Sequence, residues 1–379
     1  MTEIQKYPMK ERLSLDKGQL QTILDRLAEQ KYTLFGPTIR ENAVTYNQIS
    51  SLDQLPVGWT DEQDGGRYRL KKTTQPTLFE YVVGPQSWKK VLFPALVKLW
   101  SAKKTERGFE VDASSNNGTP KIALLCVRPC ELKALAIHDQ ILAGGDYVDP
   151  YYQSIRRDAF IIAVNCVRPG GTCFCASLGT GPRASAGFDL ALTEVFVDGK
   201  QRLVVEIGSA RGQQALEALG LQPATDAELA AANQALERAA DSMGRQLDTD
   251  RLKERLYAVF DDPYWDEIAE RCLTCGNCTM VCPTCFCMNI QDSTNLTGST
   301  AERVRCWDSC FSSSFSYIHG GSIRMSGYAR YRQWLMHKLA YWQDQFGVLG
   351  CVGCGRCITW CPVGIDITKE ATVLTKQGQ

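Results

Sequence analysis

Excess charge, long apolar runs and a secretory leader are all missing from this sequence. Basic and acidic residues number 42 each over 379 residues, so nothing indicates a nucleic-acid surface. No apolar run approaches the ~20 residues that a membrane-spanning helix needs. Residues 1–10 are polar and lack the apolar core of a signal peptide. These absences predict a cytoplasmic chain, whose length allows two or three domains.

Motifs for nicotinamide and nickel are missing too. No G-x-G-x-x-G follows a predicted strand, and the glycines at 179–187 have the wrong spacing for a dinucleotide loop. Paired C-x2-C motifs that would suggest a nickel site are not found at both ends. Histidine is scarce, with three residues. His138, in an apolar predicted helix, is expected to be a core or boundary residue, and His337, beside Lys338, is expected at the surface or an interface.

Cysteine, in contrast, is abundant and ordered. There are 17 cysteines, an odd number, in a chain much longer than a secreted disulfide scaffold. Residues 272–283 and 351–362 each read C-x2-C-x2-C-x3-C-P. This is the bacterial ferredoxin run, in which three thiolates of a loop hold one [4Fe–4S] cluster and the fourth ligates the other cluster. The alternative is a zinc site, which needs two pairs of thiolates, whereas each run here carries four.

The crossed pattern of the ferredoxin runs gives two ligand sets. The first [4Fe–4S] cluster is assigned to Cys272, Cys275, Cys278 and Cys361. The second is assigned to Cys351, Cys354, Cys357 and Cys282. Because the fourth cysteine of each loop crosses to the other cluster, we expect the two clusters to lie near each other and to form an electron path.

The other cysteines form two further groups around a repeated Thr-Cys-Phe-Cys. The first group predicts a third [4Fe–4S] cluster and consists of Cys130, Cys166, Cys173 and Cys175. Cys130 begins a predicted helix, whose N-terminus favours a thiolate. Cys166 ends a predicted strand, and adjacent strand ends would bring the two together. The alternatives are small buried apolar cysteines or zinc.

The second group offers a weaker candidate for a fourth metal site. Its members are Cys285, Cys287, Cys306 and Cys310, and Cys126 is left over. Cys285 and Cys287 follow a ferredoxin ligand directly, so the alternative is that they line its pocket. The nearby aromatic residues Trp307, Phe286 and Phe311 are expected to shield a cluster from water, which tunes its potential.

Periodicity predicts an α+β fold with a boundary near residue 260. A mixed α/β domain is expected at 1–260, and a mainly helical two-cluster ferredoxin-like domain at 261–379. The expected elements are helices at 18–30, 131–142 and 328–341, strands at 121–127 and 158–166, a hairpin around Asp198-Gly199 and a helical stretch at 209–257. The polar piece at 293–321 carries no clear pattern.

The cysteine pattern as a whole resembles one family. Residues 272–287 read Cys-x2-Cys-Gly-x-Cys-x3-Cys-Pro-Thr-Cys-x-Cys, 305–310 read Arg-x-Trp-x-Ser-Cys, and 351–357 read Cys-Val-Gly-Cys-Gly-Arg-Cys. This is similar to the iron–sulfur electron-transfer subunit of anaerobic sulfite reductases and of soluble NAD(P)-linked [NiFe] hydrogenases, the sulfhydrogenase β subunits. Residues 128–131 and 173–180 fit as well, so the match covers about 120–365. Cys126, Cys306 and the order of residues 319–322 depart from the family.

The resemblance implies a relay without catalytic residues of its own. A flavin subunit would take hydride from NAD(P)H, and this chain would pass single electrons to or from a catalytic subunit such as a [NiFe] hydrogenase or a sulfite reductase. Two other functions stay open: an iron–sulfur enzyme with its own substrate site at a cluster, and a redox sensor. The cations Arg324, Arg330, Arg332 and Lys338 form either a solvated face, a docking face or a charge near a cluster, and Arg356 lies inside a cluster loop.

Overall fold

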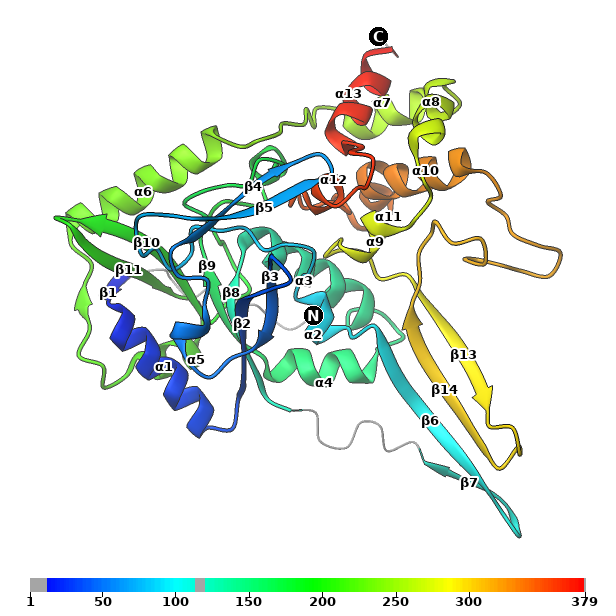
Figure 1. Ribbon diagram of the computed structural model, residues 1–379, viewed down its shortest axis with the longest axis horizontal. Coiled ribbons are helices and arrows are strands. Elements are labelled where there is room, and N and C mark those ends of the chain that lie inside the picture. The colour runs from blue at the N-terminus through cyan, green and yellow to red at the C-terminus, as the bar shows by residue number, and fades with distance from the viewer. Residues whose placement is uncertain (1–11, 113–119, 378–379) are drawn as a thin grey trace.

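The computed structural model describes residues 12–112 and 120–377, so the polar residues 1–10 lie outside the described residues. Figure 1 shows a sheet-based N-terminal part, a helical C-terminal part and a projecting arm. The predicted α+β class is confirmed: strands and helices mix in the first two thirds, and helices dominate around the ferredoxin loops. No helix of the described residues is long and apolar enough to cross a membrane.

The main sheet has eight strands in the order β12-β1-β11-β10-β9-β8-β2-β3. Their bounds are β1 Arg12–Leu15, β2 Thr33–Arg40, β3 Ala43–Gln48, β8 Ile122–Val127, β9 Phe160–Val164, β10 Leu190–Val197, β11 Lys200–Ile207 and β12 Gln222–Pro223. The central neighbours β2, β8, β9 and β10 pair in parallel, and the outer pairs are antiparallel. Strands β8 and β9 are wholly buried, as their unbroken apolar runs predict.

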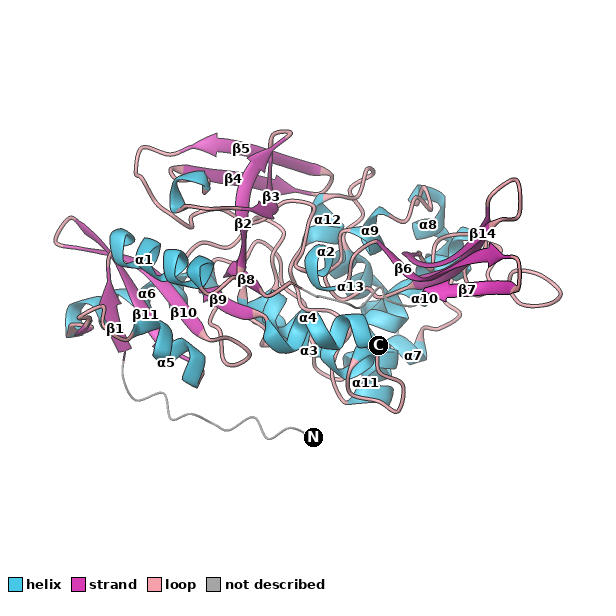
Figure 2. Ribbon diagram, turned by 90° about the horizontal axis from the view of Figure 1, so that it is seen from below, coloured by secondary structure: helices cyan, strands magenta, loops and turns pink. Residues whose placement is uncertain are grey.

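Helices pack around this sheet (Figure 2), and its central strands lie in the main apolar core. The helices of the N-terminal part are α1 Lys17–Glu29, α2 Lys89–Leu92, α3 Pro129–Leu142, α4 Pro150–Asp158, α5 Ala210–Leu216 and α6 Asp226–Asp241. Asp16 caps α1 by accepting from the Gln19 N–H, which satisfies a free donor at the helix start. The predicted stretch at 209–257 is helical but interrupted, because Gly220 (φ +62°) turns the chain before the short β12.

The C-terminal part builds its own apolar core from helices. They are α7 Leu252–Ala258, α8 Tyr264–Arg271, α9 Asn277–Met280, α10 Gly327–Met336, α11 Trp342–Phe346, α12 Arg356–Thr359 and α13 Ile367–Gln377, with a π-helical turn at His337–Tyr341 after α10. The predicted helix at 328–341 is thus confirmed. Trp265, Trp334, Leu339 and Phe311 meet in this core, next to both ferredoxin loops.

The arm is a four-stranded sheet in the order β13-β14-β6-β7. Its strands are β6 Leu96–Thr105, β7 Gly108–Asp112, β13 Met288–Thr294 and β14 Thr300–Trp307. The polar piece at 293–321, unassigned from sequence, contributes to β13 and β14. Strand β14 pairs with β6, so a segment between the ferredoxin loops joins a segment of the N-terminal part. The division near residue 260 into separate domains stays a prediction.

One hairpin brings the N-terminal part to the ferredoxin loops. Strands β4 Trp59–Asp64 and β5 Arg67–Lys72 pair around a Gly65-Gly66 turn. The Gly66 N–H donates to the Ile358 carbonyl over 3.1 Å. A Cβ on Gly66, at φ +68°, would lie 2.9 Å from the Cys361 carbonyl oxygen. Only glycine therefore lets this turn approach the second ferredoxin loop so closely.

Candidate iron–sulfur centres

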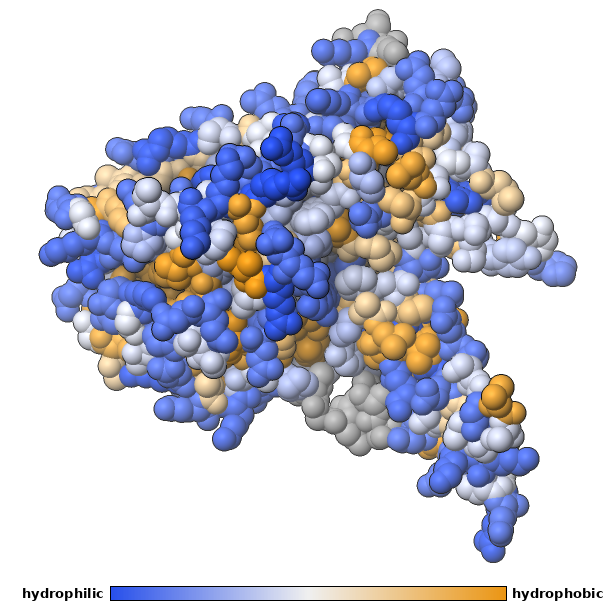
Figure 3. Space-filling view, viewed as in Figure 1, coloured by the Kyte–Doolittle hydropathy of each residue, from blue (hydrophilic) through white to orange (hydrophobic). Residues whose placement is uncertain are grey.

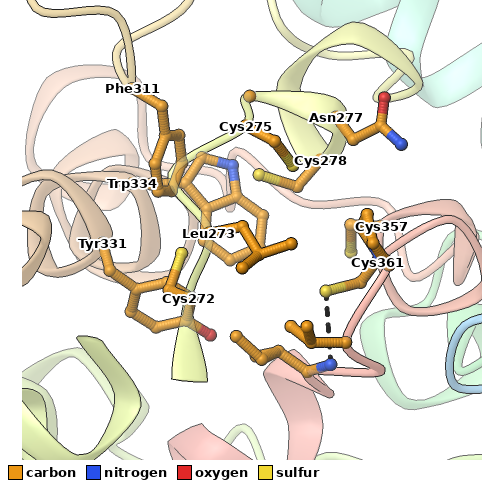
Figure 4. A pocket seen from close by; sticks show the side chains of 14 residues that line it. Cys272, Leu273, Cys275, Asn277, Cys278, Phe311, Tyr331, Trp334, Cys357 and Cys361 are labelled. Carbon is orange, nitrogen blue, oxygen red and sulfur yellow. Dashed lines mark hydrogen bonds between the residues drawn. The ribbon is translucent and has the colours of Figure 1, made fainter. Parts of the chain in front are cut away.

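The four cysteines of the first predicted set line a single pocket. Cys272, Cys275, Cys278 and Cys361 face it together with Cys357 (Figure 4). Aromatic and apolar side chains form the rest of the wall: Phe311, Tyr331, Trp334 and Ile365. The Ile365 N–H donates to Cys361 Sγ over 3.3 Å, the dashed line of Figure 4. Four thiols in a pocket with an aromatic and apolar wall are the donor set and the surroundings that a [4Fe–4S] cluster uses.

The two ferredoxin loops repeat one local conformation. In each, the glycine after the second cysteine has a left-handed backbone, at φ +74° for Gly276 and +72° for Gly355. A short helix follows each glycine, α9 after Gly276 and α12 after Gly355. Because L side chains rarely adopt this φ, glycine lets the chain turn tightly and present successive thiols to one side.

The second predicted set lies beside the first and is half-buried. Cys282 is a near neighbour of both Cys351 and Cys357, as crossed ligation requires. Burial, together with the nearby Cys354 and Cys282, raises the pKa of Cys351 to about 12, although the Gly353 N–H, which donates to Cys351 Sγ, acts in the opposite direction. Such crowded thiols release their protons only when a bound cation stabilises the thiolates. The donor chemistry therefore fits a metal cluster.

The third predicted set gathers at the carboxyl ends of two parallel strands. Cys130 stands in the first turn of α3, which follows β8, and Cys166 lies just beyond β9. Cys173 and Cys175 come in on the following loop, and burial followed by the nearby Cys166 raises the pKa of Cys173 to about 12. Burial, then Cys175 and Cys354, raises the pKa of Cys130. The structure thus brings together the four cysteines that the sequence grouped.

This third group lies directly against the second ferredoxin loop. The Phe174 N–H donates to the Gly353 carbonyl over 2.8 Å, and the Cys173 thiol to the Cys354 carbonyl over 3.8 Å. The two backbones pack so closely that a side chain at position 353 would clash, because a Cβ on Gly353 would lie 2.6 Å from the Cys175 nitrogen. Cys354 therefore belongs to the second group of thiols and contacts the third.

Buried arginines surround the third group. Arg356 donates to the Glu131 carboxylate over 2.8 Å, and both side chains are buried. Arg128 donates to the carbonyls of Phe79 and Tyr81 at 2.8 and 2.7 Å, and its Nη1 lies 3.9 Å from Cys166 Sγ. Positive charge at this position stabilises thiolates and raises the potential of a nearby cluster. For Arg356 this favours the predicted role beside a cluster.

The weaker group of cysteines is brought together only in part. Cys285 lies beside Cys282, and Cys287 beside Cys310, a contact that lowers the pKa of Cys287 to about 7 despite burial. Cys306 instead sits in β14, where its thiol donates to the Asn289 carbonyl over 3.7 Å. Cys126, the cysteine left over, is buried in β8. Among the described residues, no three His, Cys, Asp or Glu side chains close around a single ion.

Two cations near these thiols are buried rather than solvated. Lys338 is 4% exposed, and its Nζ donates to Thr284 Oγ1 over 2.6 Å. The solvated-face interpretation is therefore wrong for Lys338. Lys89 is equally buried and was missed, because nothing in its local sequence distinguishes it from a surface lysine. Arg332, in contrast, pairs with the exposed Asp261 over 2.8 Å.

The predictions for the two helical histidines have different outcomes. His138 is fully buried in α3, as predicted, and burial followed by the charge of Lys89 lowers its pKa to about 3. His337 is half-buried, and its position at the surface or an interface stays a prediction. Its Nε2 accepts from Trp342 Nε1 over 3.1 Å, and its ring packs near Phe286.

Comparison with known proteins agrees with this geometry. Residues 271–365 match the family model of the 4Fe-4S dicluster domain. The chain is 31% identical over 339 residues to the sulfhydrogenase 2 subunit beta of Pyrococcus furiosus, which covers 89% of this chain and 90% of that protein. No solved structure matches the chain. The matched domain includes both ferredoxin loops, and the relative spans the N-terminal part as well.

Proposed function

Because the chain belongs to the family of sulfhydrogenase beta subunits and is an iron–sulfur electron-transfer protein, we propose that it is the relay of a cytoplasmic oxidoreductase complex. One partner is a flavin subunit that oxidises NAD(P)H. The other is a catalytic subunit, such as a [NiFe] hydrogenase or a sulfite or sulfur reductase. Sites of hydride or substrate chemistry belong to those partners, and this chain moves single electrons.

The relay uses three [4Fe–4S] clusters in a row. The observation that carries this proposal is the contact between Cys173 and the second ferredoxin loop, 3.8 Å from thiol to carbonyl at Cys354. Ligands of the third cluster would then neighbour ligands of the second. Cys282 and Cys361 cross between the second and first clusters in the same way. An electron has a continuous path through the chain, and each cluster takes up one electron and passes it on without bond formation.

The cluster content tests this proposal. Replacing Cys173→Ser removes one thiolate, and a hydroxyl is a poorer ligand for iron. We expect anaerobically purified protein to lose about four irons and four sulfides per chain relative to the wild type. Cys126→Ser is the matched control, because Cys126 is equally buried but belongs to no group. Unchanged iron in a folded Cys173→Ser protein would leave the third cluster without support.

The first cluster lies at the surface and is the proposed point of contact with a redox partner. Cys275 is exposed, and Leu273 and Val363 beside it are 60% and 45% exposed. Figure 3 shows a small group of apolar side chains on the surface of the C-terminal part, below α13 in this view. An apolar patch around an exposed cluster ligand fits a partner subunit that brings its own redox centre close.

Polar substitution in this patch is expected to slow electron exchange with the partner. Leu273→Gln should weaken docking without removing a ligand, so the iron content stays at the wild-type value while the second-order rate of cluster reduction falls about tenfold. Stopped-flow spectroscopy at the cluster absorbance measures that rate. Phe196→Gln, at a half-exposed apolar residue of β10, is the control. Equal slowing by both variants would speak against a specific patch.

A further inference from the structure

Helix α10 presents two polar side chains to the pocket of the first cysteine set. Tyr331 and Trp334 stand three residues apart on this helix, so they lie on one face of it. The centres of their rings are 5.4 Å apart, and both rings line the pocket. Figure 4 shows both of them at its wall, with the indole nitrogen of Trp334 on the side of Cys275 and Cys278. Each ring therefore brings one hydrogen-bond donor to the wall of the pocket.

Neither donor has a partner in the described part of the chain. Trp334 is 4% exposed and Tyr331 is 3% exposed. Neither the Trp334 Nε1 nor the Tyr331 hydroxyl makes a hydrogen bond among the described residues. Buried polar groups are nearly always paired, and an indole N–H can only donate. An acceptor is therefore expected on the pocket side of these two rings.

The carboxylate nearest in charge to Tyr331 already has partners. Glu370 accepts from the Tyr264 hydroxyl over 2.7 Å and from Arg271 over 2.9 and 3.1 Å. Tyr331 makes no hydrogen bond to it. Burial, then Glu370 and then three thiols of the pocket raise the pKa of Tyr331. Its hydroxyl therefore keeps its proton at neutral pH and can donate it to an acceptor.

The absence of cations distinguishes this pocket from the surroundings of the other two cysteine sets. The buried Lys338 neighbours Cys282 of the second set, and Arg128 lies 3.9 Å from Cys166 of the third. Among the described residues, no lysine or arginine lines the first pocket. Hydrogen-bond donors, rather than cations, are what this part of the chain offers to an anionic group in the pocket.

We propose that Trp334 and Tyr331 donate hydrogen bonds to sulfur atoms of the first [4Fe–4S] cluster or its thiolates and thereby raise its reduction potential. The inference rests on the proposed function, which places a cluster in this pocket. Anionic sulfur is a stronger acceptor than a neutral thiol. Reduction adds one electron and no proton, so the cluster gains one negative charge. A donor therefore stabilises the reduced state more than the oxidised state, which raises the potential.

This adjustment keeps the first cluster in step with its neighbours in the relay. Positive charge raises the potential of the second and third clusters. Neutral donors have the same effect on the first, which is the proposed point of contact with a redox partner. Loss of either donor should make the first cluster harder to reduce, while the other two keep their potentials.

A redox titration of the full-length, anaerobically purified chain tests the proposal. Cys275→Ser removes a ligand and identifies the EPR signal of the first cluster by its loss. Trp334→Phe and Tyr331→Phe each remove one donor and keep an aromatic ring. Both should retain the wild-type iron content and lower the equilibrium constant for reduction of this cluster about tenfold. For a one-electron couple this corresponds to about 59 mV.

Two variants of the same helical core are matched controls. Trp265 is equally buried, but its Nε1 already donates to the Val259 carbonyl over 2.9 Å. Tyr328 lies on the same helix as Tyr331, and its hydroxyl accepts from Arg332 over 2.7 Å. Neither residue lines the pocket. Trp265→Phe and Tyr328→Phe should therefore leave the potential of the first cluster unchanged.

A second readout uses the wild-type protein itself. In the full-length chain labelled with ¹⁵N-tryptophan, pulsed EPR of the reduced first cluster should show a ¹⁵N coupling, which Trp265→Phe keeps and Trp334→Phe removes. The proposal is overturned if the wild type shows no coupling, or if Trp334→Phe or Tyr331→Phe keeps both its iron and the wild-type potential. Full iron in a folded Cys275→Ser protein would instead contradict the proposed function, because the first set would then hold no cluster.

Discussion

Replacing Cys354→Ser is expected to stop electron transfer through the chain. Cys354 is an assigned ligand of the second cluster and its carbonyl accepts from Cys173 of the third group, so the middle of the path is lost with it. In the assembled complex, turnover from NAD(P)H to the catalytic subunit should fall to the background rate. Reduction of the flavin by NAD(P)H should continue unchanged, because it precedes the relay.

The control for this experiment is Cys126→Ser, which alters a buried cysteine outside every assigned set. Iron analysis of both variants separates the effects: Cys354→Ser should lose about four irons per chain and Cys126→Ser none. If Cys354→Ser lost its iron and the complex still turned over at the wild-type rate, electrons would have to bypass the second cluster. The single-path account would then be wrong.

The second large effect is expected at the buried ion pair between α3 and the second ferredoxin loop. Glu131→Gln leaves the Arg356 guanidinium, 2.8 Å from the lost carboxylate, with an uncompensated charge in the interior. Breaking a buried pair from one side costs about 3–5 kcal/mol of folding free energy. It also removes a hydrogen bond, because Tyr46 donates its hydroxyl proton to Glu131 over 2.5 Å.

Anaerobic thermal unfolding of the cluster-loaded protein measures this loss. The Tm of Glu131→Gln should fall clearly, and the potential of the adjacent cluster should rise because positive charge near it is no longer balanced. Asp292→Asn is the control, since Asp292 pairs with Arg303 on the exposed surface of the arm, where ion pairs contribute little. An unchanged Tm in Glu131→Gln would show that the pair does not hold the two parts together.

Spacing alone was sufficient to predict the ferredoxin loops and the strand-end cysteines. The C-x2-C-x2-C-x3-C-P run imposes its own local geometry, and the apolar runs that became β8 and β9 placed Cys130 and Cys166 at one sheet edge. The contact of Gly353 with the Cys175 backbone could not be predicted in this way. It depends on how two distant segments pack, and position 353 is a variable position of the motif, which Thr274 occupies in the first loop.

The arm and the buried lysines also lay beyond the reach of local patterns. Strands β13 and β14 are polar, so they lack the alternation that marks a half-buried strand. Lys89 and Lys338 read as ordinary helix-surface residues, and their burial follows from the thiols around them. Cys306 shows the opposite error: its spacing to Cys310 suggested a shared site, but β14 directs its thiol to the Asn289 carbonyl. In each case tertiary packing decides where the residue lies. Local sequence patterns do not reveal that packing.

The relay itself is tested most directly by anaerobic stopped-flow reduction of the isolated chain with NAD(P)H, with and without its flavin-bearing partner. Bleaching of the iron–sulfur absorbance near 400 nm follows cluster reduction. The account predicts no reduction by NAD(P)H alone, and full reduction once the flavin subunit is added. Reduction of the clusters by NAD(P)H in the isolated, flavin-free chain would contradict it, because the chain would then accept hydride itself.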